Sequence, residues 1–174
     1  MGIDPSTKTG CVLCTKKPTG LHVEDHGEIE YKGQKGMQRV QSIGQRMAKF
    51  LDVWEPQVVV MEGYGYANMH SLVTLVEIGT MIRLCIVERR IPLCVVAPNT
   101  LKKWVTGKGN AKKDVMMLET YKRWNFEGTD NEVDAFGLAA LGLYAGNPDL
   151  EPELSAGQKK VMQAFRAEHL DVFS

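Results

Sequence analysis

The chain has 174 residues, of which 44% are hydrophobic and 24% charged, a composition typical of one globular domain with a packed core. It opens without a signal peptide, and its most apolar stretch, residues 72–87, contains Glu77 and Arg83 and is too short to span a bilayer comfortably. From these features we expect a cytoplasmic protein rather than a secreted or membrane one.

Charge is unevenly distributed although the formal net charge is zero. Residues 125–174 contain three basic and nine acidic side chains, whereas residues 102–123 contain seven basic and two acidic ones. This asymmetry favours a basic surface that faces DNA and an acidic region that holds metal ions. An ordinary solvated charged face is the alternative.

The first third of the chain predicts β structure. A strand is expected over residues 2–5, a turn over 6–10, and hairpin strands over 11–15 and 21–31. The CxxC of Cys11 and Cys14 lies on such a strand, where positions three apart face opposite sides, so buried free thiols are expected rather than a zinc site.

The middle of the chain alternates helices and strands. Apolar residues at three- and four-residue steps predict a helix over 37–54, ended by Glu55-Pro56, and the apolar run 57–61 predicts a buried strand. A loop over 63–69, a helix over 72–89, a strand over 92–96 and a short helix over 99–105 follow. The resulting order predicts an α/β fold with a mixed sheet, in which the first and fourth strands are parallel neighbours.

The last third predicts helices over 111–124 and 131–144, with a loop over 107–110 before them. A further helix is expected over 158–168, after Pro148 and Pro152. We therefore expect one domain over residues 1–147 and a partly helical C-terminal tail over 148–174.

Three acidic residues are candidates for one shared site. Asp4 lies on the first strand and Glu62 ends the fourth, so both reach the same sheet edge if these strands are parallel neighbours. Asp134 is expected in the first turn of the helix over 131–144, where the helix N-terminus would keep it ionised. Thr129 and Glu132 resemble a capping box for that helix.

Carboxylates that converge from different elements suit the hydrolysis of phosphodiesters. Two divalent ions about 4 Å apart stabilise the attacking and leaving oxygens, and Mg²⁺ prefers carboxylate oxygens and water. Asp130 and Asn131 stand four and three residues before Asp134 and can share its helix face. The alternative is that each acid is an ordinary charge at a turn, a strand end or a helix start.

Four segments resemble, in the same order, the motifs of RuvC-type Holliday junction resolvases. They are GIDPSTKTG at 2–10, VVVMEGYGY at 58–66, LKKWVTGKGNAKKDV at 101–115 and DNEVDAFGLAALG at 130–142. The resemblance implies an RNase H-like fold with a five-stranded mixed sheet, a homodimer, two Mg²⁺ or Mn²⁺ ions per site, and symmetric nicks in four-way DNA junctions. The compact chain is also similar to bacteriophage versions of the family.

Position by position, the resemblance makes Asp4, Glu62 and Asp134 metal-binding catalytic carboxylates. It places Lys102 and Lys113 near the scissile phosphate. The family usually has Asp or His where this chain has Asn131, so either Asn131 coordinates through its amide oxygen or Asp130 substitutes for it.

Other residues are candidates for binding DNA. The family often has an aromatic residue where this chain has Gly65, so Tyr64 or Tyr66 is expected either to stack on DNA bases or to pack on the next helix. Lys103, Lys108 and Lys112 extend the basic segment. Lys112 and Lys113 fall in the expected first turn of a helix, where a lysine opposes the helix dipole unless a phosphate binds there.

The helix over 72–89 is apolar on more than one face, which favours the interface of a two-fold homodimer over simple burial in the core.

The sequence thus predicts a structure-selective DNA endonuclease that uses two metal ions. Three alternatives remain: a non-catalytic junction-binding protein, an RNase H-type enzyme that cuts RNA–DNA hybrids, and an actin-like phosphotransferase. The last normally needs two such domains, for which 174 residues are too few.

Overall fold

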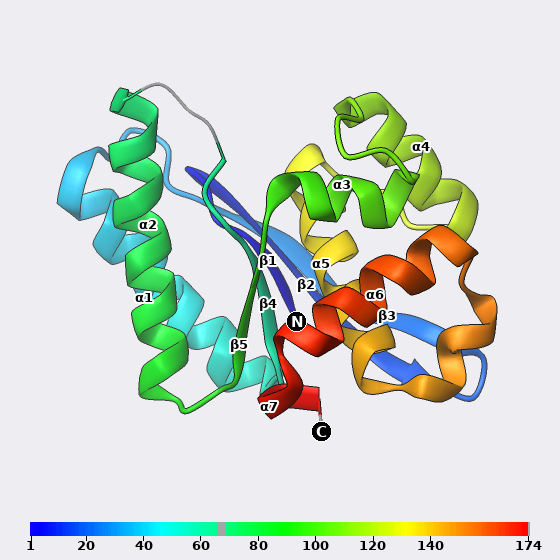
Figure 1. The fold of residues 1–174 in the computed structure, drawn as a ribbon. Coiled ribbons are helices and arrows are strands. Elements are labelled where there is room, and N and C mark those ends of the chain that lie inside the picture. The colour runs from blue at the N-terminus through cyan, green and yellow to red at the C-terminus, as the bar shows by residue number, and fades with distance from the viewer. Residues whose placement is uncertain (66–68, 174) are drawn as a thin grey trace.

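The computed structural model describes residues 1–65 and 69–173 and contains one five-stranded sheet (Figure 1). The strands run in the order β3-β2-β1-β4-β5. Strand β2 pairs antiparallel with β1 on one side and with β3 on the other. Strand β4 pairs in parallel with β1 on one side and with β5 on the other. The predicted mixed sheet and the parallel pairing of the first and fourth strands are confirmed. The strands comprise β1 (Gly2–Asp4), β2 (Lys8–Lys17), β3 (Gly20–Glu30), β4 (Val59–Glu62) and β5 (Leu93–Val96).

The turn between β1 and β2 is shorter than the sequence predicts. Residues 8–10 belong to β2, so the predicted turn over 6–10 is wrong in its second half. A local hydrogen-bond pair closes the turn, because Thr9 Oγ1 donates to the Ser6 carbonyl at 2.7 Å and the Lys8 amide donates to Ser6 Oγ at 3.1 Å. As a result, Gly10 lies directly opposite Asp4 in the sheet.

Helices cover both faces of the sheet (Figure 1). One face packs against α1 (Gly36–Trp54) and α2 (Met69–Glu88), and the other against α3 (Pro98–Thr106) and α5 (Asp130–Gly146), with α4 (Lys113–Trp124) outside them. Cys11 is buried with the α1–α2 layer and Cys14 with the α5 layer, and both thiols are free. The expected opposite orientation of these two cysteines is confirmed.

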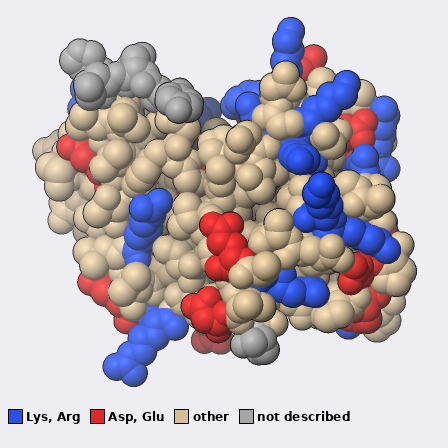
Figure 2. Space-filling model, viewed as in Figure 1, with Lys and Arg blue, Asp and Glu red and all other residues tan. Residues whose placement is uncertain are grey.

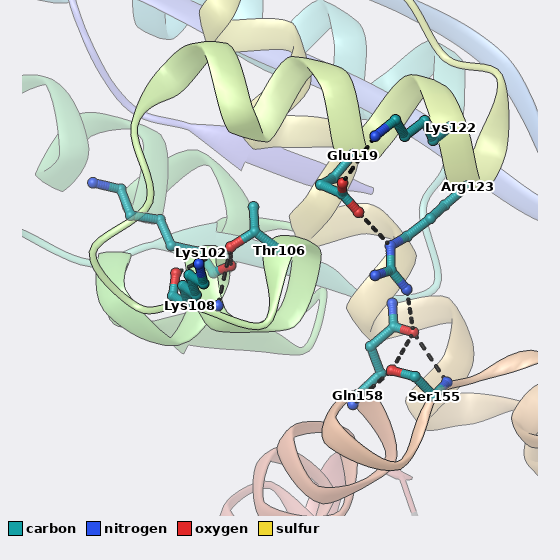
Figure 3. Close-up of polar contacts among 8 residues, drawn as sticks. All are labelled: Lys102, Thr106, Lys108, Glu119, Lys122, Arg123, Ser155 and Gln158. Carbon is teal, nitrogen blue, oxygen red and sulfur yellow. Dashed lines mark hydrogen bonds and ion pairs between the residues drawn. The ribbon is translucent and has the colours of Figure 1, made fainter.

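The last segment of the chain packs on the same core as α5. It forms η1 (Pro148–Glu153), α6 (Ala156–Glu168) and α7 (Leu170–Phe173). Val161, Met162 and Phe165 of α6 are buried in the α5 cluster, and Arg123 of α4 donates to Gln158 Oε1 of α6 at 3.0 Å (Figure 3). This segment therefore supports the helices that carry the basic residues. Over residues 1–65 and 69–173, no helix is long and apolar enough to cross a membrane.

Candidate active site at the ends of β1 and β4

Asp4 and Glu62 meet where β1 and β4 end. Ile3 pairs with Met61 across the two parallel strands, so the next residue of each strand reaches the same edge of the sheet. Asp4 is only 7% exposed, and its carboxyl group lies close enough to that of Glu62 for each group to affect the pKa of the other. Burial and the mutual repulsion of the acids raise the pKa of both groups well above their usual range.

Asp134 approaches the same edge from α5. The helix begins at Asp130 with the predicted capping box of Thr129 and Glu132, so Asp134 lies in the second helical turn rather than the first. Burial raises the pKa of Asp134 to about 6, although Lys113 and Lys102 act in the opposite direction. With a pKa of about 6, Asp134 is still mostly ionised at neutral pH, and a contribution of the helix N-terminus to this stays a prediction, since the dipole effect fades after the first turn. The charge of Asp134 in turn raises the pKa of Asp4 and Glu62.

Two lysines provide positive charge at the three carboxylates. Lys113, the first residue of α4, lies with its Nζ 3.2 Å from Asp130 Oδ2. Partial burial alone would lower the pKa of Lys113, but the bond to Asp130 and the nearby acids outweigh it and raise that pKa. Lys102 of α3 lowers the pKa of Glu62 and Asp134. The structure thus brings together the five residues that the sequence assigns to catalysis.

The other predicted DNA-binding lysines lie on the same helical layer but in different places. Lys and Arg side chains gather over α3 and α4 (Figure 2). Thr106 Oγ1 donates to the Lys102 carbonyl at 2.8 Å and accepts from the Lys108 amide at 3.1 Å, which fixes the connection after α3 (Figure 3). Lys103 instead lines a cavity of about 300 Å³ between β5, α3 and α6. Lys112 is exposed at the N-cap of α4, which begins at Lys113, so the predicted helix start at residue 111 and the place of Lys112 in the first turn are wrong.

Asp130 and Asn131 have different partners. Asp130 pairs with Lys113, whereas Asn131 Nδ2 donates to Glu28 Oε1 at 2.7 Å. Glu28 lies on β3 and its charge raises the pKa of Asp4. Glu28 is not among the residues predicted from the sequence, because its place beside the site depends on strand register. The available signal was the alternation of polar residues along the strand over 21–31.

Tyr64 packs on α2. Its hydroxyl donates to the Val76 carbonyl at 3.4 Å, and Arg83 stacks over its ring at 4.9 Å from the centroid. In this position Tyr64 matches the expected packing on the next helix, and its expected stacking on DNA stays a prediction. Tyr66 lies outside the described residues.

The donor set fits hard divalent cations. Burial raises the pKa of all three carboxyl groups, and a divalent ion would supply positive charge that favours their ionised forms. Within residues 1–65 and 69–173, no three Asp, Glu, His or Cys groups surround a single point closely enough to hold one ion. This arrangement still suits Mg²⁺, which keeps several waters and is usually bound by one or two carboxylates.

Gly10 allows α5 to cross the sheet beside the carboxylates. A Cβ on Gly10 would lie 2.1 Å from the backbone oxygen of Asn131, too close for any side chain. Gly10→Ala is therefore expected to displace the start of α5 and lower the free energy of unfolding by about 1–3 kcal/mol. Urea unfolding measures the change. Gly27→Ala on the adjacent strand is the control, since a Cβ there meets nothing within 4 Å, and equal losses in both variants would contradict the close approach.

Comparison with known proteins relates the whole arrangement to one family. Residues 1–139 match the family model described as crossover junction endodeoxyribonuclease RuvC. The RuvC enzyme of Chlamydia caviae is 30% identical over 148 residues, which cover 80% of this chain and 88% of that protein. The enzyme of Chlamydia felis is 28% identical, with coverage of 86% and 94%.

Solved structures agree with this relationship at the level of the fold. RuvC of Thermus thermophilus in complex with a Holliday junction substrate superposes with a TM-score of 0.69 at 20% identity, covering 83% of this chain and 92% of that chain. The yeast mitochondrial resolvase Ydc2 gives a TM-score of 0.59 at 12% identity, with coverage of 98% and 81%. By sequence and by fold, the chain belongs to the RuvC family of crossover junction endodeoxyribonucleases.

Proposed function

We propose that this protein is a structure-selective endonuclease that resolves Holliday junctions and other branched DNA by metal-dependent phosphodiester hydrolysis. The observation that carries the proposal is the convergence of Asp4, Glu62 and Asp134 from β1, β4 and α5. The RuvC relatives, whose names state the same activity, support it.

The three carboxylates would hold two Mg²⁺ ions, for which Mn²⁺ substitutes, with Asn131 as the candidate fourth ligand. Asp130 is the weaker candidate because Lys113 already occupies its carboxylate. When bound, the ions stabilise charge on the attacking and leaving oxygens and lower the pKa of a bound water. Lys113 and Lys102 offset the negative charge of the phosphate beside the carboxylates.

Cleavage of a labelled four-way junction in the presence of Mg²⁺ or Mn²⁺ tests the proposal. We expect paired nicks in opposite strands of the junction, and little product from linear duplex DNA or an RNA–DNA hybrid. Tight binding without product would favour a non-catalytic junction-binding protein. Preferred cutting of the hybrid would favour an RNase H-type activity.

We further propose that two copies of the chain associate through α2. The helix buries Ile78, Ile82 and Ile86 against the core but leaves a second apolar stripe at the surface. The exposed members of that stripe are Val73, Val76, Leu84 and Val87. A two-fold dimer with one site in each copy matches the two-fold symmetry of a four-way junction.

Leu84→Glu is expected to convert the dimer into a monomer without unfolding it, because a charge would be buried in the apolar interface. Light scattering after size-exclusion chromatography measures the mass. Leu118→Glu is a matched control, since Leu118 of α4 is 50% exposed and Leu84 is 51% exposed. Dissociation by the Leu118 variant alone would place the interface on α4 instead.

We propose that DNA phosphates outside the catalytic centre are bound by Lys103, Lys108 and Lys112. We propose that Tyr64 or Tyr66 stacks on bases at the junction.

We also propose that residues 1–147 form the nuclease domain and that the C-terminal segment supports it. The enzyme is proposed to act in the cytoplasm, which is that of the host cell if the protein comes from a bacteriophage.

A further inference from the structure

Glu28 lies in the same cross-strand row as Asp4. Asp4 is opposite Gly10 on β2, and Gly10 is opposite Glu28 on β3. Directly opposed residues project from the same face of a sheet, and two strand spacings separate their backbones by about 10 Å. Because Gly10 has no side chain, no group from β2 stands between the two carboxylates.

The start of α5 fills the space above Gly10. The backbone oxygen of Asn131 would be 2.1 Å from a Cβ at that position, so Asn131 lies directly over the row. Asn131 is thereby placed between Asp4 on one side and Glu28 on the other.

Two hydrogen bonds join Glu28 to this helix start. Asn131 Nδ2 and Thr129 Oγ1 both donate to Glu28 Oε1, each at 2.7 Å. The Glu28 side chain is only 19% exposed, and Lys8 Nζ lies 3.9 Å from its other oxygen. A carboxylate only accepts hydrogen bonds, so Glu28 fixes the orientation of the Asn131 amide with its nitrogen toward β3.

We infer that Glu28 is a positioning residue of the metal-binding site, which holds Asn131 so that its amide oxygen is available to a divalent ion. Glu28 also contributes the negative charge that a neutral amide ligand lacks. The inference rests on the proposed function, because it assumes that the neighbouring carboxylates bind metal. Partners of this kind orient the groups that bind metals, and their loss commonly weakens metal binding 10- to 100-fold.

Binding of Mn²⁺ to the DNA-free protein tests the inference, measured by electron paramagnetic resonance. Glu28→Ala is expected to raise the dissociation constant about 10- to 100-fold. Glu30→Gln is the matched control, because Glu30 lies on the same strand and pairs with the same Lys8, at 3.6 Å. Glu30 lies opposite Lys8, two residues further along β3, so its variant is expected to bind Mn²⁺ as the unmodified protein does.

A charge swap separates positioning from a purely structural role. Asn131→Asp alone places two carboxylates against each other and is expected to lower the melting temperature. In the double variant Glu28→Gln with Asn131→Asp, the amide introduced on β3 donates to the carboxylate introduced on α5 and restores the pair with reversed roles. We expect this variant to recover both the melting temperature and Mn²⁺ binding at least as tight as that of the unmodified protein.

Metal binding and DNA cleavage can fail separately. If Glu28→Ala binds Mn²⁺ as the unmodified protein does, or if the swap restores the melting temperature but not Mn²⁺ binding, the positioning role is overturned. If the unmodified protein binds Mn²⁺ but cuts no branched DNA, the proposed function fails while the role of Glu28 at the metal-binding site stands.

Discussion

Asp4→Asn is expected to slow junction cleavage by about 10³-fold or more, a loss of about 4 kcal/mol of transition-state stabilisation. Asp4 is the most buried of the three carboxylates, and its charge also raises the pKa of Glu62. An amide at this position keeps the shape of the side chain but removes the charge that would hold a divalent ion. Single-turnover cleavage of a labelled four-way junction, with saturating protein and Mg²⁺, measures the change.

Junction binding should survive the same substitution. The lysines proposed to bind DNA lie on α3, on α4 and in the connection between these helices, away from the substituted side chain, and the substitution removes a negative charge that would repel phosphates. Glu62→Gln should behave in the same way, whereas Glu30→Gln, on the exposed end of β3, should cut normally. Loss of binding in both site variants with an intact fold would argue against the assignment, as would cleavage by Asp4→Asn within tenfold of the unmodified protein.

The metal-free protein should become less stable as the pH rises from about 5 to 8, with a change on the order of several kcal/mol. Burial and mutual repulsion raise the pKa of Asp4 and Glu62, and burial raises that of Asp134 to about 6. An acid with a raised pKa in the folded state binds more protons there than in the unfolded chain. Its stabilising effect is complete below about pH 4 and is lost as the pH passes the folded-state pKa.

Urea unfolding at each pH, with a chelator present, measures this dependence. Two comparisons show whether the three acids cause this pH dependence. Asp4→Asn should make the free energy of unfolding depend less on pH. Mg²⁺ should restore the free energy of unfolding at pH 8, because it binds only the folded state. A metal-free protein that is as stable at pH 8 as at pH 5 would show that the three acids do not repel one another. The same would follow if Asp4→Asn unfolded with an unchanged pH dependence.

The carboxylates that dominate these predictions could be located from the sequence. A buried apolar run that ends at Glu62 and a short strand that carries Asp4 must meet at one sheet edge once the two strands are parallel neighbours. The capping box of Thr129 and Glu132 likewise located the start of α5 within one residue. These inferences depend only on local patterns and on one topological rule.

Other features depend on information that local patterns do not carry. Glu28 reaches the site only because the turn before β2 ends at Thr7, which sets the register that aligns Asp4, Gly10 and Glu28. The raised pKa of Asp134 depends on burial by elements distant in the chain, which outweighs the effect of Lys113 and Lys102. Tyr64 is equally compatible in sequence with DNA stacking and with packing on α2, and only the coordinates show the contact with Val76.

The wide separation of Asp4, Glu62 and Asp134 along the chain has a consequence for the cell in which the protein is made. A nascent polypeptide that has left the ribosome only as far as β4 has two of these acids but not the third, and a proteolytic fragment is similarly incomplete. Cutting ability would therefore arise only once synthesis has passed α5 and the sheet has assembled. Copies that end before α5 would lack one of the three carboxylates.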